Sequence, residues 1–511
     1  MKKYINLITA ILLVLFTMGC QDAWEDHADI ADNTASATLM ELLESRSEYS
    51  NFVSAIKTSG LDSIINQPIM LTVWAPDNEA FTNIPDDKEE LKILVGNHIN
   101  YGAVQVKQLT EIQKLSMVNG KYVEVDGSGN KVDQVTISTV DIPAKNGFLQ
   151  LVDNTLEPRM NIWEYVENYS GTSKHIEYLN SLSGEVFDPE VAEIIGYTND
   201  GQAIYDTLSG MVWKNAFLDE VADLRAEDST FTLLIIDDSA FDTEFNKYLP
   251  YYKVSPSVTE EALKLDTAMC LSKITKDYAF STSYTASDIP SLVLSVDSIM
   301  VPIDKNLITE SFYASNGWVH HISACPVPLE NKILPIIVET ESINRFIDNY
   351  KINGNDIAGS PGGHLRIRPQ ASGGFDYVLD NWSSGVQASG LILHAGTVAA
   401  TKYKFYWKAV NDFNGSYRLP DTSEDFVLRQ RLGYTTLIDE TNEVFNFNPM
   451  TGVSDFTDVT ALSYDEAVEE EVGMRSFTYM RDLYVWLQNE GDKAVTADYI
   501  KLVPVFEQSE N

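Results

Sequence analysis

An internal repeat runs through the first part of the chain. In one copy an apolar strand with a turn, Leu71 to Phe81, precedes an Asn-Gly step at Asn146 that opens a second apolar strand. The same order recurs from Phe231 to Phe241, with the matching Asn-Gly step at Asn316. Similar intervals separate the motifs in both places, and two diverged copies of one folding unit explain this better than chance.

Helical and hairpin patterns surround these motifs. Thr38 to Glu41 has the sequence of a capping box, and apolar residues follow at helical spacing up to Ile56. Asn161 to Glu164 offers a cap at the same place in the second copy. The glycines between Tyr122 and Val132 predict a β-hairpin. Each copy is therefore expected to combine helices with strands.

These motifs resemble those of the fasciclin family. Thr72 to Phe81 is similar to the family's first motif, and both Asn-Gly strands are similar to its terminal motif of Asn, Gly, an apolar residue and His. The resemblance covers about residues 37–332. It implies two compact domains, each a β-sandwich with helices, that serve binding or adhesion and not catalysis.

The sequence also departs from the family pattern. Ile236 to Asp238 replaces the Ala-Pro-Asp turn in the second copy, and a stretch near 196–217 has no counterpart in the first. Many family members carry a Tyr-His pair in the central region, where this chain has Asn97 and His98. The role that this pair has in adhesion is therefore not carried over to this chain.

Beyond Pro335 the pattern changes to short strands and glycine-rich turns, which predicts an antiparallel β-sandwich over residues 335–511. Its last strand, Thr496 to Val505, resembles the jelly-roll modules that often bind carbohydrate. The expected fold class is α+β, with fasciclin-like domains at 37–160 and 161–332 followed by this sandwich.

The N-terminus has the order of a bacterial lipoprotein signal peptide. A basic start precedes an apolar run from Ile5 to Phe16 that is too short to span a membrane, and Gly19 stands directly before Cys20. This resembles a lipobox, although Thr17 stands where Leu is usual. We expect residues 1–19 to be removed and Cys20 to carry the lipid that holds the chain at a membrane.

An acidic segment, residues 20–36, follows the proposed anchor. Asp22, Glu25 and Asp26 crowd Cys20, which resembles the signals that send some lipoproteins to the outer face of the outer membrane. The alternative is a solvated acidic linker. The expected location is the outer membrane, with the chain facing the cell exterior.

The net charge of −39 limits the partners. Binding to nucleic acid requires clustered Lys and Arg, so nucleic acid is excluded as an expected partner. A neutral ligand, a cationic ligand or a protein fits this charge better. Apart from Cys20 only Cys270 and Cys325 are present, and they form either one disulfide or two packed thiols.

Known catalytic motifs are missing from the sequence. It contains no GxSxG, P-loop, HExxH or dinucleotide fingerprint. His320 and His321 are neighbours in an expected strand, so their side chains point to opposite faces and do not share a metal ion. Asp126 to Lys131 is interpreted as a hairpin turn and not a calcium loop, because Lys131 stands where the loop needs glycine. No enzyme activity, cofactor or metal is expected.

Aromatic residues of the third region are the candidate ligand contacts. Strand alternation from Tyr403 to Trp407 puts Trp407 in the core and Tyr406 on the other face. In the strand around Trp486, Leu483, Val485 and Leu487 share the expected buried face, which leaves Tyr484 and Trp486 outward. With Trp382 in a polar loop, the candidates are Trp382, Tyr406, Tyr484 and Trp486. Alternatively, such aromatics pack beneath a loop or a neighbouring domain.

These patterns lead to one function and two alternatives. The chain is expected to be a surface lipoprotein for extracellular binding, acting beside the SusC-like channel and SusD-like binding protein of a Sus-like importer of glycan or peptide. The first alternative is an adhesin that binds host or neighbouring-cell proteins through its fasciclin-like pair. A glycan hydrolase with a site in the sandwich is the less favoured alternative.

Overall fold

The computed structural model describes residues 36–347, 362–380, 390–412, 428–439, 444–449, 457–489 and 495–506. Contacts divide the chain into two compact units: Met1–Asn168 with Leu224–Thr230 and Tyr313–Gly317, and Tyr169–Asp223 with Phe231–Phe312 and Trp318–Asn511. Cys20 and Trp382 lie outside the described residues. Helices and sheets occur together, so the expected α+β class is confirmed.

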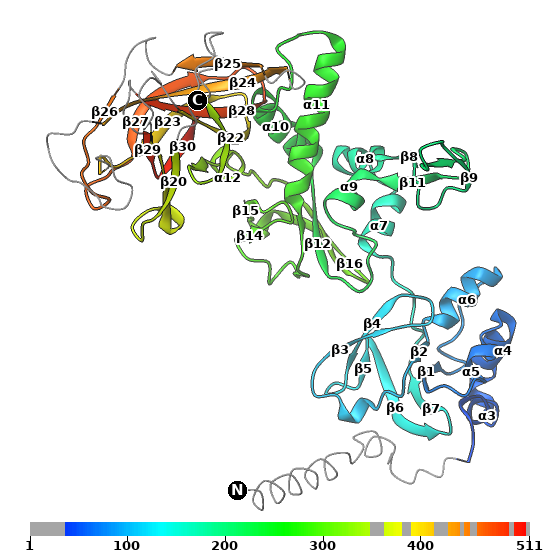
Figure 1. The fold of residues 1–511 in the computed structure, drawn as a ribbon. Coiled ribbons are helices and arrows are strands. Elements are labelled where there is room, and N and C mark those ends of the chain that lie inside the picture. The colour runs from blue at the N-terminus through cyan, green and yellow to red at the C-terminus, as the bar shows by residue number, and fades with distance from the viewer. Residues whose placement is uncertain are drawn as a thin grey trace, which may run out of the picture. The chain divides into compact units, whose positions relative to one another are not determined.

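The first unit holds a seven-stranded sheet in the order β2-β1-β7-β6-β5-β4-β3 (Figure 1). Strand β1 pairs antiparallel with β2 and parallel with β7. The strands are β1 (Leu71–Pro76), β2 (Ile99–Tyr101), β3 (Gln113–Ser116), β4 (Tyr122–Asp126), β5 (Lys131–Val132), β6 (Val135–Ala144) and β7 (Gly147–Val152). The helices are α3 (Leu39–Glu44), α4 (Ser50–Ser59), α5 (Asp62–Ile65), α6 (Lys88–Gly96) and α7 (Ile162–Asn168).

Both sides of β1 are buried. Val73 packs toward the helices, in a core that includes Leu43 and Phe52 of α3 and α4. Trp74 points the other way, into a second core with Val123 and neighbouring residues of the β3 to β6 half. Alternating strand side chains thus serve two cores from one strand, which explains why this strand is buried at every position.

The predicted local signals are present. The Thr38 side chain accepts a hydrogen bond from the Glu41 amide, and the Glu41 carboxylate accepts one from the Thr38 amide, as in a capping box. Asn161 and Glu164 exchange the same two bonds at the start of α7. The glycines after Asp126 form the turn between β4 and β5, so the predicted hairpin is confirmed.

The Asn-Gly steps perform the same task in both copies. The Asn146 side chain accepts from the Leu39 amide at 2.9 Å and donates to the Ile65 carbonyl at 2.8 Å. The Asn316 side chain accepts from the Ile162 amide at 2.9 Å and donates to the Leu224 carbonyl at 2.8 Å. One buried amide therefore joins the first helix of each copy to the hairpin that precedes its last strand.

A second pair of contacts also recurs. The Thr72 hydroxyl accepts from the Val104 amide at 2.8 Å, and the Gln150 side chain donates to the Val104 carbonyl at 3.0 Å. In the second copy the Thr232 hydroxyl accepts from the Tyr284 amide at 2.8 Å, and His320 Nε2 lies 2.9 Å from the Tyr284 carbonyl. The two copies thus share a hydrogen-bonding frame as well as a sequence pattern.

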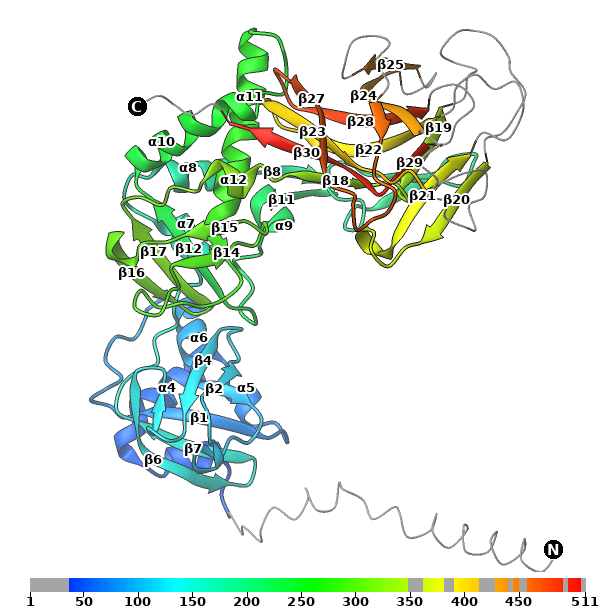
Figure 2. The same cartoon turned by 90° about the vertical axis from the view of Figure 1, so that its left-hand side faces the viewer.

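The second unit contains the rest of the repeated region, with a four-stranded sheet in the order β13-β12-β17-β16 (Figure 2). Its strands are β12 (Phe231–Ile236), β13 (Ala279–Phe280), β16 (Ile308–Ala314) and β17 (Gly317–Ile322), with the hairpin β14 (Leu292–Leu294) and β15 (Met300–Pro302). Its helices are α8 (Lys174–Ser181), α9 (Ala216–Glu220), α10 (Asp238–Tyr248), α11 (Glu260–Thr275) and α12 (Leu329–Lys332). Unlike the first copy, the chain after β12 enters a helix directly at Asp238.

Two short ribbons are inserted between α8 and α9. Strands β8 (Ser183–Phe187) and β11 (Met211–Asn215) form one, and β9 (Ile194–Tyr197) and β10 (Ala203–Tyr205) form the other. We call residues 183–215 the finger. It overlaps the stretch near 196–217 that has no counterpart in the first copy and extends it towards the N-terminus to residue 183.

The predicted C-terminal sandwich is present, and every pairing in it is antiparallel. Its sheets are ordered β18-β30-β23-β27, β19-β22-β28-β24-β25 with β26 on β24, and β20-β21-β29. The strands are β18 (Ile336–Glu339), β19 (Ile343–Ile347), β20 (Gly362–Ile367), β21 (Phe375–Asp380), β22 (Gly390–Val398), β23 (Lys402–Lys408), β24 (Leu428–Asp439), β25 (Val444–Pro449), β26 (Thr457–Val459), β27 (Glu470–Ser476), β28 (Arg481–Asn489), β29 (Val495–Ala497) and β30 (Tyr499–Val505). Phe405 and Trp407 of β23 pack with Leu483 and Val485 of β28 in its core, as predicted.

The two cysteines are free and buried. Of the two alternatives that the sequence left open, the structure has two packed thiols and not a disulfide. Burial raises the pKa of each thiol, Cys270 and Cys325, to about 12. Neither is therefore a reactive thiolate at neutral pH. Among the described residues, no helix combines the length and the apolar character needed to cross a membrane.

Candidate functional site

Asn97 and His98, at the family's central position, are part of the protein interior. The His98 side chain is fully buried; Nδ1 lies 3.0 Å from the Leu94 carbonyl, and Nε2 accepts from the Leu156 amide at 2.9 Å. Asn97 donates to the Leu156 carbonyl at 2.9 Å. Burial lowers the pKa of His98 to about 4, so the ring is neutral at physiological pH. These contacts give the pair a structural role, with no surface available to a partner.

His320 and His321 lie on opposite faces of β17, as strand alternation predicts. His320 Nδ1 is 2.8 Å from the Ser311 hydroxyl, while His321 stacks on the Tyr169 ring with centroids 5.2 Å apart. Across the described ranges, His, Cys, Asp and Glu side chains form no group of three suited to holding a metal ion.

The candidate ligand residues of the sandwich lie on two different sheets. Tyr406 is on β23, where its hydroxyl donates to Glu471 at 3.2 Å beside the Lys404–Glu471 ion pair. Tyr484 and Trp486 are on β28, in the sheet with β22 and β24. Of the three predicted residues that the structure describes, Tyr406 is therefore not in one site with Tyr484 and Trp486.

Trp486 is on the face opposite Leu483, Val485 and Leu487, as predicted, but its side chain is only 3 % exposed. It packs with Ile392 and Tyr484 in a small cluster, and its indole donates to the Tyr434 carbonyl at 3.1 Å. The expectation that both aromatics would be open is wrong for Trp486, because neighbours on the same face cover it. Tyr484 is half-buried.

An exposed polar row lies next to this cluster. The His394 ring stacks on Tyr484, with centroids 4.7 Å apart, because β22 and β28 place the two residues directly opposite each other. His394 Nε2 lies 2.7 Å from Asp482 Oδ1, and both side chains are about half exposed, at 45 % and 51 %. Together they offer one ring stack and one carboxylate, the elements that orient a sugar.

Arg431 of β24 extends this face. Its guanidinium Nε and Nη2 donate to Gln488 at 2.9 and 2.5 Å, and its Cζ is 5.5 Å from the centre of the Trp486 ring. We call His394, Arg431, Asp482, Tyr484 and Gln488 the sandwich face. The sequence did not identify His394 and Arg431, since only strand register brings these distant residues beside Tyr484.

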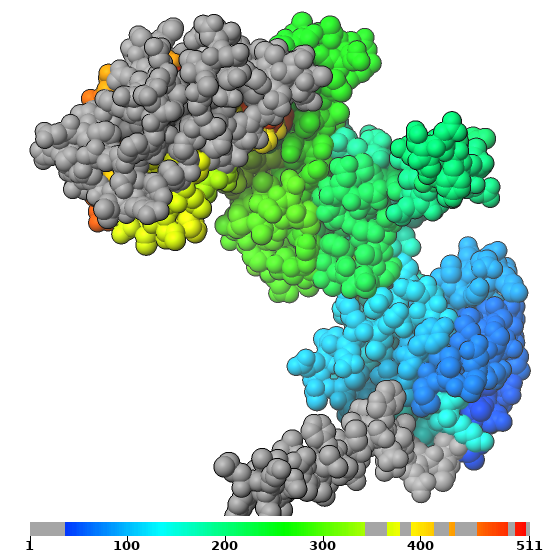
Figure 3. Space-filling view, viewed as in Figure 1, coloured from blue at the N-terminus to red at the C-terminus, as the bar shows by residue number. Residues whose placement is uncertain are grey.

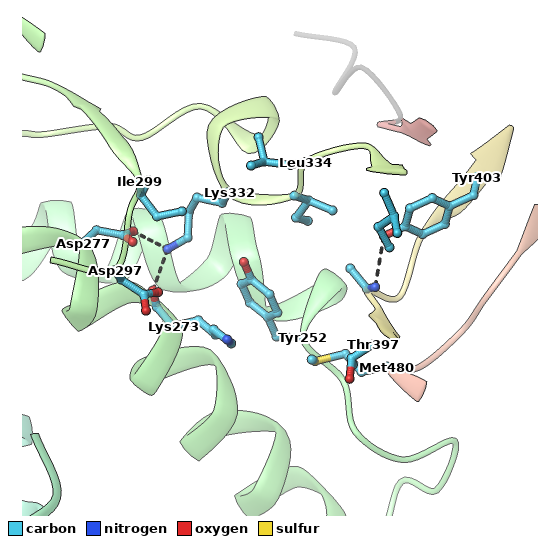
Figure 4. A pocket seen from close by; sticks show the side chains of 13 residues that line it. Tyr252, Lys273, Asp277, Asp297, Ile299, Lys332, Leu334, Thr397, Tyr403 and Met480 are labelled. Atoms are coloured by element: carbon cyan, nitrogen blue, oxygen red, sulfur yellow. Dashed lines mark hydrogen bonds and ion pairs between the residues drawn. The ribbon is translucent and has the colours of Figure 1, made fainter. Parts of the chain in front are cut away.

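A cavity of about 280 Å³ lies where α11, α12 and the β22–β23 turn approach one another (Figure 4). The buried Lys332 ammonium donates to Asp277 and, at 2.7 Å, to the Lys273 carbonyl. Tyr252, Thr397 and Met480 complete the wall (Figure 4). Because its central charges neutralise each other and its volume is below that of typical ligand sites, we assign this cavity a structural role.

Several solved structures resemble the fold only faintly. A FAS1 domain pair from the insect cell adhesion molecule Fasciclin I aligns over 56 % of this chain and 99 % of its own, at 16 % identity and a TM-score of 0.22. The xylan-binding CBM22-1 domain of Paenibacillus barcinonensis aligns over 34 % of this chain and 96 % of its own, at 13 % identity and a TM-score of 0.19. Scores this low carry no weight for fold or function.

Curated relatives match a short part of the chain. Transforming growth factor-beta-induced protein ig-h3 of Sus scrofa is 28 % identical over 137 residues, which is 25 % of this chain and 20 % of the relative. Human Stabilin-1 is 30 % identical over 136 residues, 24 % of this chain and 5 % of the relative. Protein sll1483 of Synechocystis is 23 % identical over 141 residues, 25 % of this chain and 78 % of the relative.

The chain thus spans a fifth or less of ig-h3 and Stabilin-1, and the similarity is that of one domain. A family model gives the position of this domain in the chain. The model described as Fasciclin domain matches residues 47–158. These residues include the sheet of the first unit from β1 to β7. Residues 47–158 therefore form a fasciclin domain.

Proposed function

We propose that this chain is a lipid-anchored binding protein of a bacterial cell surface, which attaches to proteins or glycans outside the cell. The observation that carries the proposal is the fasciclin domain at residues 47–158, because such domains occur in adhesion proteins. The repeated hydrogen-bonding frame around Asn146 and Asn316 supports a second domain of the same kind. The leader ending in Cys20 supports the anchor.

Within this proposal, the chain serves a Sus-like importer as an accessory lipoprotein beside SusC-like and SusD-like proteins. The support is the combination, in one acidic chain, of a lipoprotein leader, fasciclin-like domains and a sandwich with a polar, aromatic face. A metal-dependent catalytic role finds no support, since the described residues offer no grouped metal ligands.

Protease treatment of intact cells tests the location. We expect external protease to remove the full chain while a periplasmic marker survives, and Cys20→Ala to release the chain from the membrane fraction. Complete protection of the chain while the outer membrane is intact would contradict a surface location. Retention of Cys20→Ala in the membrane would contradict the anchor.

Attachment of cells tests the function. Cells with the full chain should bind immobilised extracellular proteins more strongly than cells whose chain lacks residues 37–332. Equal surface amounts of both chains, measured with an antibody to the sandwich, are the control. Unchanged attachment without these residues would rule out adhesion through the fasciclin-like pair.

A second candidate function, glycan binding, is favoured by the sandwich face. His394, Asp482 and Tyr484 are accessible, and the stacked rings and the carboxylate are close enough to contact one sugar unit. The face also includes Arg431 and Gln488, whose side chains are already fixed by their mutual hydrogen bonds. Such prior ordering reduces the entropic cost of binding.

A glycan array with the full-length chain tests this candidate. Tyr484→Ala should weaken binding by about tenfold, which corresponds to about 1.4 kcal/mol. Tyr406→Ala, on the other sheet, is the matched control and should bind as the unchanged chain does. Loss of binding only with Tyr406→Ala would move the site to β23, and equal binding by all three chains would exclude both aromatics.

A further inference from the structure

The finger exposes an unusual concentration of large apolar side chains. Leu208 is 85 % exposed, Trp213 69 %, Tyr197 67 % and Ile195 66 %. Further exposed residues of the same segment are Val186, Phe187, Val191, Ile194, Ile204 and Met211. In Figure 3 the finger stands out as a separate knob of atoms beside the second unit's helices. A concentration of exposed apolar side chains of this size is typical of an interaction site.

Neither ribbon covers its own apolar residues. Met211 pairs with Phe187 and Val212 with Val186, so apolar side chains occur on both faces of the β8–β11 ribbon. Within the described residues, each ribbon remains two-stranded and joins no larger sheet. An isolated two-stranded ribbon is marginally stable in water, and a surface that buries its faces would stabilise it.

The base of the finger is nevertheless anchored. The Asn215 side chain donates to the Leu179 carbonyl of α8 at 2.8 Å and to the Ser183 hydroxyl at 2.9 Å. Its oxygen accepts from the Phe217 amide at 2.9 Å, which caps α9. Near the middle, Lys214 pairs with Asp188 at 3.0 Å, and the Phe187 ring meets Tyr205 edge-on. The finger is therefore held at its root and open along its length.

The charge of the finger selects the kind of partner. It carries six acidic residues, Glu185, Asp188, Glu190, Glu193, Asp200 and Asp206, and a single basic one, Lys214, which is paired with Asp188. An acidic rim repels anionic lipid headgroups and, at a net charge of −39, a second copy of the chain. A protein surface rich in Lys and Arg is attracted by it.

We propose that the finger is a docking element that inserts into an apolar groove, bordered by Lys and Arg, on a different protein. Burial of Trp213, Leu208 and Ile195 supplies the affinity, and the acidic rim supplies orientation and association rate. The finger shares no residue with the sandwich face or with the fasciclin domain at 47–158. The proposal therefore does not depend on glycan binding or on adhesion.

Site-specific photo-crosslinking in the native cells identifies the partner. The full-length chain carries a photoreactive amino acid at Leu208 or Trp213, and at Val258 as a matched control, since Val258 is 86 % exposed but outside the finger. We expect one discrete protein to be joined to the first two positions and not to the third. Crosslinks to lipid or to a second copy of this chain would overturn the proposal. So would a result in which the finger positions capture only the proteins that position 258 also captures.

Binding of the purified partner to the full-length chain then tests the mechanism. Trp213→Ser should weaken binding at least about tenfold, the double change Glu190→Lys and Glu193→Lys should also weaken it, and Val258→Ser should leave it unchanged. Higher salt should reduce the association rate. Vesicles of zwitterionic and of anionic lipid should not bind. Unchanged affinity in both finger variants, or vesicle binding that Trp213→Ser abolishes, would contradict a protein groove as the occupant.

Discussion

At the scale of single residues, Gly147 and Gly317 occupy positions closed to every other residue type. Their φ angles are 142° and 143°, in a region that L-residues avoid. A Cβ on Gly147 would lie 1.7 Å from the Leu71 carbonyl oxygen. The close approach follows from the parallel pairing that places Gly147 opposite Leu71. The Asn-Gly step is thus fixed by sterics at Gly and by hydrogen bonds at Asn.

Substitution of Gly147 by Ala should destabilise the fasciclin domain by more than about 3 kcal/mol, because strain at φ adds to a backbone clash. Gly60→Ala is the matched control: Gly60 also has a positive φ, 81°, but a Cβ there would meet no atom within 4 Å. That change should cost about 1 kcal/mol. Urea unfolding followed by circular dichroism measures both, and similar losses would contradict the steric account.

A second residue-scale prediction concerns pH. His98 has a folded pKa of about 4 against an ordinary value of 6.5, so the unfolded chain takes up its proton first as the pH falls. The fasciclin domain should therefore lose stability between about pH 6.5 and pH 4, on the order of 2–3 kcal/mol. His98→Gln, which keeps a donor and an acceptor without titrating, should flatten this part of the pH profile in calorimetry. If His98→Gln left the slope of stability against pH unchanged, His98 would not be the source of this pH dependence.

At the scale of elements, the buried pair Asp277–Lys332 joins the end of α11 to α12. Both side chains are at most 2 % exposed. Burial raises the pKa of Asp277 to about 6 and lowers the pKa of Lys332, so the charged form of each group has a desolvation cost that its partner helps to offset. The pair thus connects the segment directly after α11 to the last residue of α12.

Asp277→Leu alone should destabilise the second unit by about 3–5 kcal/mol, because it leaves the Lys332 ammonium buried without a counter-charge. Adding Lys332→Met should restore most of this loss. A double-mutant cycle in urea provides the measurement. Additive losses in the double variant would show that the two side chains act independently.

Sequence patterns were strongest where neighbours in the chain decide the structure. The capping boxes at Thr38 and Asn161 and the hairpin after Asp126 are local, and all three were predicted. The alternation that puts Trp407 in the core is local as well. These signals need no knowledge of the distant chain.

The sandwich face illustrates what such patterns miss. His394, Arg431 and Tyr484 meet only through the register of β22, β28 and β24, which no local signal specifies. The burial of Trp486 has the same origin, because Ile392 covers it from a neighbouring strand. The finger appeared in the sequence only as an unmatched stretch, and its exposure required the structure.

At the scale of the whole molecule, the dominant property is the acidic balance. The chain has 75 acidic and 36 basic residues. Some of the half-buried cations are paired with acids, as Lys121 is with Glu164 and Glu227 at 2.5 and 2.6 Å. The remaining acids repel one another across the surface, which opposes the compact state.

Added salt should therefore stabilise the protein. Between about 10 mM and about 1 M sodium chloride the screening length falls from about 30 Å to about 3 Å, and the melting temperature at pH 7 should rise. The same series near pH 4.4, the isoelectric point, is the control and should show a much smaller rise. A rise of equal size at both pH values would attribute the effect to salting-out.

The Asn146 bonds also have a mechanical consequence under the proposed anchoring of the chain at Cys20. The entering segment is tied to the β6–β7 turn by the Leu39 amide on Asn146 and by the Lys145 amide on the Ala37 carbonyl, and β7 leads out of the domain. Tension applied at the two ends of the fasciclin domain would run through this turn and along β7. A pull on the entering segment would therefore act on the bonds at the β6–β7 turn and on the pairing of β7 with β1 and β6.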